Sequence, residues 1–225
     1  MKVEICGVTS TRWLQVDISG EDEGIAINYV SREIGFCPEN VERISRFMTL
    51  KGYITNYEKD KEELIVDIGV FEPKPVNARI SLSQLQSQLV DGRPLPLKKI
   101  TELYGLGEDL PLKIKVNKIS AEERIEAELA VEQVLKYNLW IESLLDRLIV
   151  LGVTREEAQR ALSHTGLWRD VIDVESLGFF EQSLTCKLGT DAVGLISTVG
   201  RNLRNAKILS FNPGEIRRDQ SSNKT

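Results

Sequence analysis

The sequence is poor in the residues that build metal and disulfide sites. It holds three cysteines and one histidine in 225 residues. Cys6, Cys37 and Cys186 are odd in number, lie far apart and form no C-x-x-C pair, so they predict neither a disulfide framework nor a zinc site. His164 alone excludes a histidine-rich metal centre, and we expect it to be a polar residue at the end of a helix. We therefore assign no metal ligand and no cofactor.

The chain also lacks long apolar segments and a leader-like start. Its longest apolar runs, LIVDIGV and LIVLGV, are far shorter than the roughly 20 residues that cross a bilayer. No charged and apolar leader stands at Met1. We therefore expect a cytoplasmic protein with no membrane partner.

Motifs of catalysis are missing as well. The sequence contains no P-loop, no G-x-G-x-x-G, no G-x-S-x-G and no H-E-x-x-H. We assign no catalytic residue, and we expect a protein that is not an enzyme.

Charge limits the kind of nucleic-acid contact that the chain can make. The formal net charge of −5 argues against a protein that coats nucleic acid without specificity. The charge is uneven, because residues 41–120 carry 13 basic and 11 acidic side chains, whereas residues 121–178 carry 6 and 12. Residues 179–225 carry 7 and 4. The middle and the C-terminal segments are therefore the places where a phosphate backbone is attracted.

The middle of the chain has the pattern of a small closed β-barrel. It runs TLKGYITNYEKDKEELIVDIGV, then ARISLSQL, then LPLKIKV. A glycine opens an alternating strand, a charged turn follows, a second strand ends in Ile-Gly, and a third strand enters a short helix. This order resembles an S1-type OB fold over residues 46–119, with Gly52 and Ile54 at the family's opening and Lys113 in its closing strand. Barrels of this type bind RNA or single-stranded DNA.

The resemblance implies a set of nucleic-acid-binding residues. The family's exposed aromatic falls near Ile65 and its histidine falls at Ser81, so both usual stacking residues are missing. Two tyrosines are the candidates to replace them, and nearby cations are the candidates for phosphate contacts. The predicted site consists of Lys51, Tyr53, Tyr57, Lys59, Arg79, Lys113 and Lys115. The alternative is that one tyrosine belongs to the core and the other side chains form a solvated face.

The flanking segments predict two further units. Residues 1–45 contain two alternating strands and an amphipathic helix that ends at Gly35, which together form a β-β-α unit. In residues 120–213 we expect a long acidic helix over 120–152 with a capping box at Ser120, a tight turn at Gly152, and a second helix capped by Thr154. The expected order after this helix is strand, strand, helix, strand, with Thr190 or Asp191 as the cap of the helix. Residues 214–225 are expected to be a disordered tail.

The predicted fold class is therefore α+β, with three small units around a central S1/OB-like β-barrel. The N-terminal unit is β-β-α, and the C-terminal unit combines a helical hairpin with a β-β-α-β arrangement.

Nearly the whole chain resembles an uncharacterised archaeal family, domain of unknown function 2110. The segments that carry the resemblance are VDISGEDEGIAINYVSREIG, ARISLSQL with YGLGEDLPLKI after it, and RDVIDVESLGFFEQSLTCKLGTDAVGLIS. The N-terminus looks shorter than in relatives, which have another strand and helix ahead of Met1. The resemblance implies an archaeal cytoplasmic protein and no particular activity.

The function predicted from these patterns is a non-enzymatic, nucleic-acid-associated protein, with single-stranded RNA favoured over DNA as its partner. The alternative is a protein-interaction adaptor in an RNA or translation-related assembly, in which a partner docks on the barrel face and the acidic helix. A basic stripe with aromatics would favour the nucleic-acid-binding protein. An exposed apolar patch would favour the adaptor, and a deep pocket with clustered carboxylates would favour an enzyme.

Overall fold

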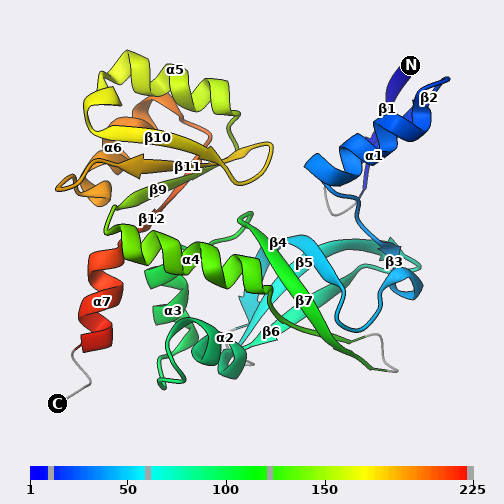
Figure 1. Cartoon of the computed structure of the whole chain (residues 1–225), viewed down its shortest axis with the longest axis horizontal. Helices are drawn as coiled ribbons and strands as arrows, with labels where there is room; N and C mark the ends of the chain where they lie inside the picture. The colour runs from blue at the N-terminus through cyan, green and yellow to red at the C-terminus, as the bar shows by residue number, and fades with distance from the viewer. Residues whose placement is uncertain (10–12, 59–61, 121–123, 222–225) are drawn as a thin grey trace.

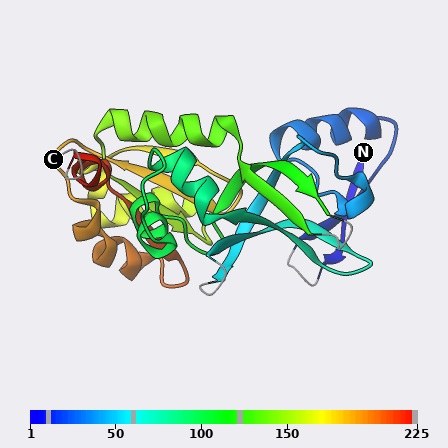
Figure 2. The ribbon, with the colours of Figure 1, turned by 90° about the horizontal axis from the view of Figure 1, so that it is seen from below.

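The structure, a computed structural model, describes residues 1–9, 13–58, 62–120 and 124–221. The molecule is elongated, with an N-terminal unit at one end, a β-barrel in the middle and a C-terminal sheet at the other end (Figures 1 and 2). This arrangement confirms the predicted α+β class with a central barrel. In the described part of the chain, no helix is long and apolar enough to cross a membrane.

The N-terminal unit has the predicted β-β-α order. Strands β1 (Lys2–Val8) and β2 (Leu14–Ser19) form an antiparallel hairpin, and helix α1 (Glu23–Glu33) packs against β2. Few of its apolar side chains are covered. The exposed ones on the two strands are Val3, Ile5, Val8, Leu14 and Val16.

Five strands close the central barrel. They are β4 (Thr49–Glu58), β5 (Glu63–Glu72), β6 (Val76–Ser81), β7 (Pro111–Ile119) and β8 (Ile125–Leu129). Each pairs with two others in the cyclic order β4-β5-β6-β8-β7, and only the β6–β8 pair within this ring is parallel. This is the connectivity of an OB fold. A short strand β3 (Glu39–Asn40) adds to β5 in parallel, and a 3₁₀ turn η1 (Val41–Arg43) follows it.

The barrel wall separates apolar and charged residues by simple alternation. On β7, Leu112, Ile114 and Val116 are almost completely buried inside the barrel. Lys113 and Lys115 lie between them in the sequence and point outward, because successive side chains of a strand face opposite sides. Between β6 and β7 the chain inserts helices α2 (Leu82–Leu89) and α3 (Leu97–Tyr104), and α2 is the short helix predicted after the third strand.

The long helix predicted over residues 120–152 is wrong. This segment contains strand β8, helix α4 (Val131–Ser143) and strand β9 (Arg147–Leu151). Apolar residues at 125, 127 and 129 are buried on one side of β8, a period of two that fits the fifth barrel strand. Ser120 does not cap a helix, because its Oγ accepts a hydrogen bond from the Arg124 backbone at 3.2 Å. Strand β9 separates α4 from the next helix, so the predicted helical hairpin does not form.

The C-terminal unit is an antiparallel sheet in the order β10-β11-β9-β12. Helix α5 (Arg155–Thr165) and the turn η2 (Leu167–Arg169) lead to β10 (Val171–Ser176) and β11 (Glu181–Cys186). Helix α6 (Ala192–Asn202) and β12 (Lys207–Phe211) complete the predicted strand, strand, helix, strand order. The predicted capping box of Thr154 and Glu157 is present, and Asp191 caps α6.

The C-terminal tail predicted to be disordered forms helix α7 (Pro213–Ser221), while residues 222–225 lie outside the described part. Asn212 accepts the Glu215 amide proton at 2.9 Å and starts this helix. Ile216 is buried in the core, and Asp219 accepts hydrogen bonds from Arg93, including one to its carboxylate at 3.0 Å. The buried Ile216 and the Arg93–Asp219 ion pair therefore hold α7 against the rest of the protein. The polar composition of this segment gave no sign of a packed helix.

An aromatic cluster joins the barrel insertion, α4 and the C-terminal sheet. Phe211 of β12 contacts Tyr104 of α3 and both Tyr137 and Trp140 of α4, with ring centroids 5.2 to 6.2 Å apart. Tyr104 donates its hydroxyl proton to the Leu89 carbonyl. The barrel and the lower face of the C-terminal sheet therefore share one continuous core.

Candidate nucleic-acid interface

A groove of about 490 Å³ lies where the three units meet. Its walls come from the end of α1, the beginnings of β4 and β7, helix α4, and the end of β10. Figure 1 shows α4 running between the C-terminal sheet and the barrel, beside these strands.

Three lysines line the groove. Lys51 on β4 stands directly opposite Lys113 on β7 in the antiparallel register, and Lys136 reaches the groove from α4. Like charges in directly opposed positions destabilise a sheet. Among the described residues, neither Lys51 nor Lys113 forms an ion pair. The arrangement costs the fold stability, and an anion in the groove would relieve the repulsion.

Acidic side chains moderate this positive charge from the side of the C-terminal sheet. Glu175 pairs with Lys136 at 2.6 Å. Burial lowers the pKa of Lys51, while the nearby Glu181 carboxylate opposes that shift. Burial also raises the pKa of Glu181, whose Oε2 has no hydrogen-bond partner in the described part of the chain. Of the three groove lysines, Lys113 is exposed, whereas Lys51 and Lys136 are half-buried.

Lys115 extends the positive row beyond the groove. It lies two residues after Lys113 on the same outer face of β7, and its Nζ pairs with Glu128 at 3.2 Å. The same Nζ lies 5.4 Å from the ring centroid of Phe47, which Arg46 also approaches at 4.5 Å. An exposed aromatic ring between two cations therefore stands at the end of the lysine row.

Tyr53 is not an open stacking platform. Trp13 of the N-terminal unit packs against it edge-on, with ring centroids 5.5 Å apart. Burial raises the pKa of Tyr53 to about 12, with a further contribution from Glu181. Trp13 of the N-terminal unit thus covers one of the two tyrosines that the sequence predicted to contact bases.

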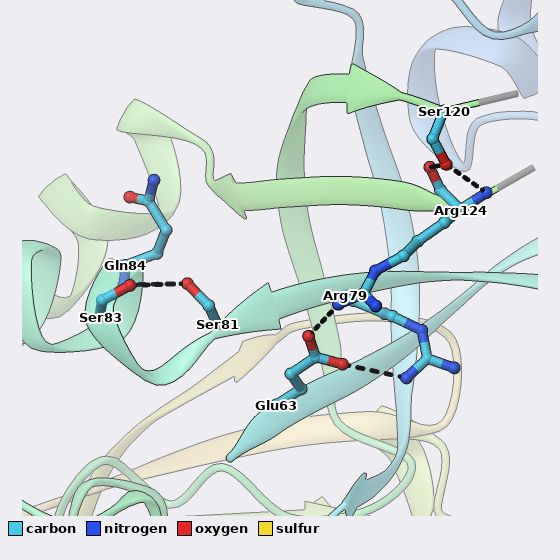
Figure 3. A network of polar contacts seen from close by, with 7 residues as sticks. All are labelled: Glu63, Arg79, Ser81, Ser83, Gln84, Ser120 and Arg124. Atoms are coloured by element: carbon cyan, nitrogen blue, oxygen red, sulfur yellow. Dashed lines mark hydrogen bonds and ion pairs between the residues drawn. The ribbon is translucent and has the colours of Figure 1, made fainter. Parts of the chain in front are cut away.

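Arg79 stands in a different part of the barrel. Its Nη1 pairs with Glu63 Oε2 at 3.0 Å, and Arg124 pairs with the other oxygen of the same carboxylate (Figure 3). Glu63 lies on β5, Arg79 on β6 and Arg124 just before β8, so this network fastens the seam that closes the barrel. Arg79 does not line the groove. The predicted Tyr57 side chain and Lys59 lie outside the described residues.

The structure therefore brings Lys51 and Lys113 together, places Lys115 beside them, and sets Arg79 apart. Tyr53 lies two residues after Lys51 on the same face of β4, but Trp13 covers it. Sequence reasoning missed Lys136, because its helix is contributed by a segment that the sequence assigned to another unit. It also missed Phe47. The available signal for Phe47 was its position beside Arg46, directly before the first barrel strand.

The barrel and the C-terminal unit match the models of a known domain family. Family models described as the DUF2110 central domain and the DUF2110 C-terminal domain match residues 47–141 and 145–210. The chain belongs to the DUF2110 family, as its sequence predicted.

Other comparisons add little to this assignment. Among curated proteins, none matches the chain. One solved structure similar to the chain is described as "putative exosome complex RNA-binding protein", with 11% identity, 79% of this chain and 97% of that chain covered, and a TM-score of 0.27. At this TM-score the likeness supports no inference about function.

Proposed function

We propose that this protein binds nucleic acid, RNA in particular, by holding phosphates in the groove with Lys51, Lys113 and Lys136, and that it catalyses no reaction. The observation that carries the proposal is the direct opposition of Lys51 and Lys113 with a third lysine across the groove. Cations gathered at a cost to the fold are expected where a polyanion binds, because phosphate contacts release counterions and dominate affinity.

The net charge fits a local rather than a general contact. With −5 overall, most of the surface repels nucleic acid, so a bound strand is directed to the few positive places. The groove and the row from Lys113 to Lys115 form such a place. Binding is therefore expected to be weak at high salt and confined to a short stretch of backbone.

The test is RNA binding across a salt series with the double variant Lys51→Ala/Lys113→Ala. Lys98→Ala/Lys99→Ala on α3 is the matched control, because it removes the same charge away from the groove. We expect the groove variant to bind more weakly and to flatten the plot of log affinity against log salt by about 1.4, since each single-strand phosphate contact contributes about 0.7. Absence of binding by the wild type at low salt, or equal losses in both variants, would contradict the proposal.

A protein-interaction adaptor is the second candidate, and one observation favours it. Val131, Leu135 and Leu139 lie at helical spacing on α4 and are all exposed. An unpaired apolar stripe on a helix is a typical docking surface for another protein. Substituting Leu135 and Leu139 with glutamine would separate the two functions, because it leaves the lysine row intact.

A further inference from the structure

Three exposed phenylalanines lie at the two ends of the lysine row. Phe47 is 58% exposed, and Phe179 and Phe180 are 62% and 55% exposed. Single-strand-binding surfaces combine exposed aromatic rings with cations, so these rings beside the lysine row are candidates for base stacking.

Packing contacts set the order of these groups along β7. Phe47 lies against Lys115, and Lys113 and Pro111 are the next residues on the same outer face of the strand. A Cβ placed on Gly178 would lie 3.7 Å from Pro111 Cγ, so the β10–β11 turn stands over the far end of the row. At about 3.3 Å per residue, the strand from 115 to 111 spans about 13 Å. Aromatic rings therefore bracket a short row of phosphate-binding cations.

Phe47 is held in a conformation that its own side chain disfavours. Its φ of 69° lies in the left-handed region, which bulky residues rarely adopt. Its amide donates to the Val116 carbonyl at 2.7 Å, which fixes the backbone and presents the ring outward. Glycine or asparagine would fit this backbone better, so the backbone conformation gives no reason for phenylalanine at this position.

Phe179 and Phe180, the aromatic pair at the other end of the row, stand on an anchored turn between β10 and β11. The Glu181 carbonyl accepts hydrogen bonds from the amides of Leu177 and Gly178, and the Phe180 carbonyl accepts two from the chain after β9. The two phenyl rings lie 6.4 Å apart and remain exposed. The turn thus carries its rings into solvent on a fixed backbone.

We infer that the ligand is a single strand whose bases stack on Phe47 at one end and on Phe179 and Phe180 at the other, with phosphates on Lys113 and Lys51 between them. This inference rests on the proposed function. Stacking requires unpaired bases with free faces, whereas a duplex offers only its backbone and groove edges. The combination of aromatic rings and cations therefore selects single-stranded RNA over double-stranded RNA.

The experiment compares wild type with Phe47→Leu and with Phe179→Leu/Phe180→Leu, which keep an apolar side chain but remove the ring. The probes are a labelled oligouridylate of about 12 nucleotides, within the site sizes of OB folds, the matching DNA strand, and an RNA duplex of the same length. Trp168→Leu, an exposed aromatic on the turn after α5, is the control. We expect each ring variant to bind the single strand about fivefold to a hundredfold more weakly per lost stacked base. Its salt dependence should not change, and tryptophan at the same positions should restore affinity.

The outcomes separate this inference from the function on which it rests. If the leucine variants bind like wild type while Lys51→Ala/Lys113→Ala does not, the stacking role is wrong and the phosphate groove stands. If wild type binds the duplex as tightly as the single strand, the stacking role is also wrong. Tighter binding of the DNA strand would overturn the choice of RNA. If wild type binds none of the probes, both proposals fail and the adaptor function takes their place.

Discussion

The indole Nε1 of Trp13 donates a hydrogen bond to Oδ2 of Asp67 at 3.0 Å, across the junction between the N-terminal unit and the barrel. The other oxygen of Asp67 accepts the Gly69 amide proton at 2.8 Å, so the carboxylate is fixed on β5. Gly69 has a φ of 79°, and a side chain there would collide with Cys37 and Trp13. The tryptophan is therefore held by a hydrogen bond to Asp67 and by close packing on Gly69, with the Tyr53 ring edge-on to its own.

Removing this tryptophan should change the ionisation of Tyr53. In Trp13→Ala the phenol becomes accessible to water, so its pKa should fall from about 12 toward the ordinary value of 10.0. Phenolate absorbance between about pH 9.5 and pH 11.5 measures the change. In a Tyr53→Phe background, the same Trp13→Ala substitution should leave the titration unaltered. An equal change in both backgrounds would mean that another tyrosine responds.

Glu181→Gln should alter how stability depends on pH. Burial raises the pKa of Glu181 above its ordinary 4.5, so the folded state holds the proton more tightly than the unfolded state. The contribution of this group is therefore fully present below pH 4.5 and is lost as pH rises through the folded pKa. As the pH rises from 4.5 through the folded pKa of Glu181, the free energy of unfolding of the wild type in urea should fall relative to that of Glu181→Gln. Glu142→Gln, on an exposed part of α4, should show no such difference, and a wild-type loss that grows toward acid would contradict the assignment.

Phe47→Asn should cost the protein little or no stability. Asparagine tolerates the left-handed backbone, and relief of about 1 kcal/mol of strain offsets a loss of about 0.5 to 1 kcal/mol from the contacts with Arg46 and Lys115. Phe211→Ala, at a completely buried position, should instead cost about 3 to 5 kcal/mol. Urea unfolding of both variants gives the comparison. A large loss at Phe47 would show that its ring serves the fold.

Glu63→Gln should weaken the closure of the barrel without changing RNA affinity. The carboxylate pairs with both Arg79 and Arg124, and hydrogen bonds to charged groups are each worth about 1.5 to 3 kcal/mol, less where the partners are exposed. We expect a loss of about 1 to 3 kcal/mol in the free energy of unfolding. Glu126→Gln, an exposed carboxylate on β8, is the matched control. If Glu63→Gln binds RNA more weakly at a temperature where the variant is folded, Arg79 belongs to the RNA-binding surface after all.

Ile216→Ala tests whether α7 belongs to the folded body. The side chain is 1% exposed, so its truncation should cost about 2 to 4 kcal/mol. Ile172→Ala, at an exposed position on β10, should cost less than about 0.5 kcal/mol. Thermal unfolding of the two variants suffices. Equal transition temperatures of Ile216→Ala and Ile172→Ala would mean that α7 is detached in solution. The helix lies after residue 210, where the match to the C-terminal family model ends.

Local patterns predicted the elements whose signals are complete within a few residues. The capping box of Thr154 and the alternation around Lys113 appear in the structure where the sequence places them, and Asp191 is the cap among the two residues predicted, Thr190 and Asp191. The prediction for residues 120–152 failed because alanine, glutamate and leucine favour helices as single residues. Closure of the barrel imposed a strand on the first part of that segment instead, a preference that only the partner strands β6 and β7 can supply.

The candidate site was predictable to a similar extent. Lys51 and Lys113 follow from the barrel pattern, since both lie on outward positions of paired strands. Contacts between units were not predictable in this way. Trp13 covers Tyr53 from one side, and α4 brings Lys136 from the other, and neither position has a local signal.

The aromatic cluster around Phe211 has a consequence for how a strand is received. It interlocks β12 with α3 and α4, and α4 and the barrel provide opposite walls of the groove. Walls joined through a shared core cannot hinge apart as those of two tethered domains do. These two walls of the groove are therefore preorganised, so a strand that binds between them loses little free energy to ordering them, and most of the entropy that binding removes there comes from the flexible strand.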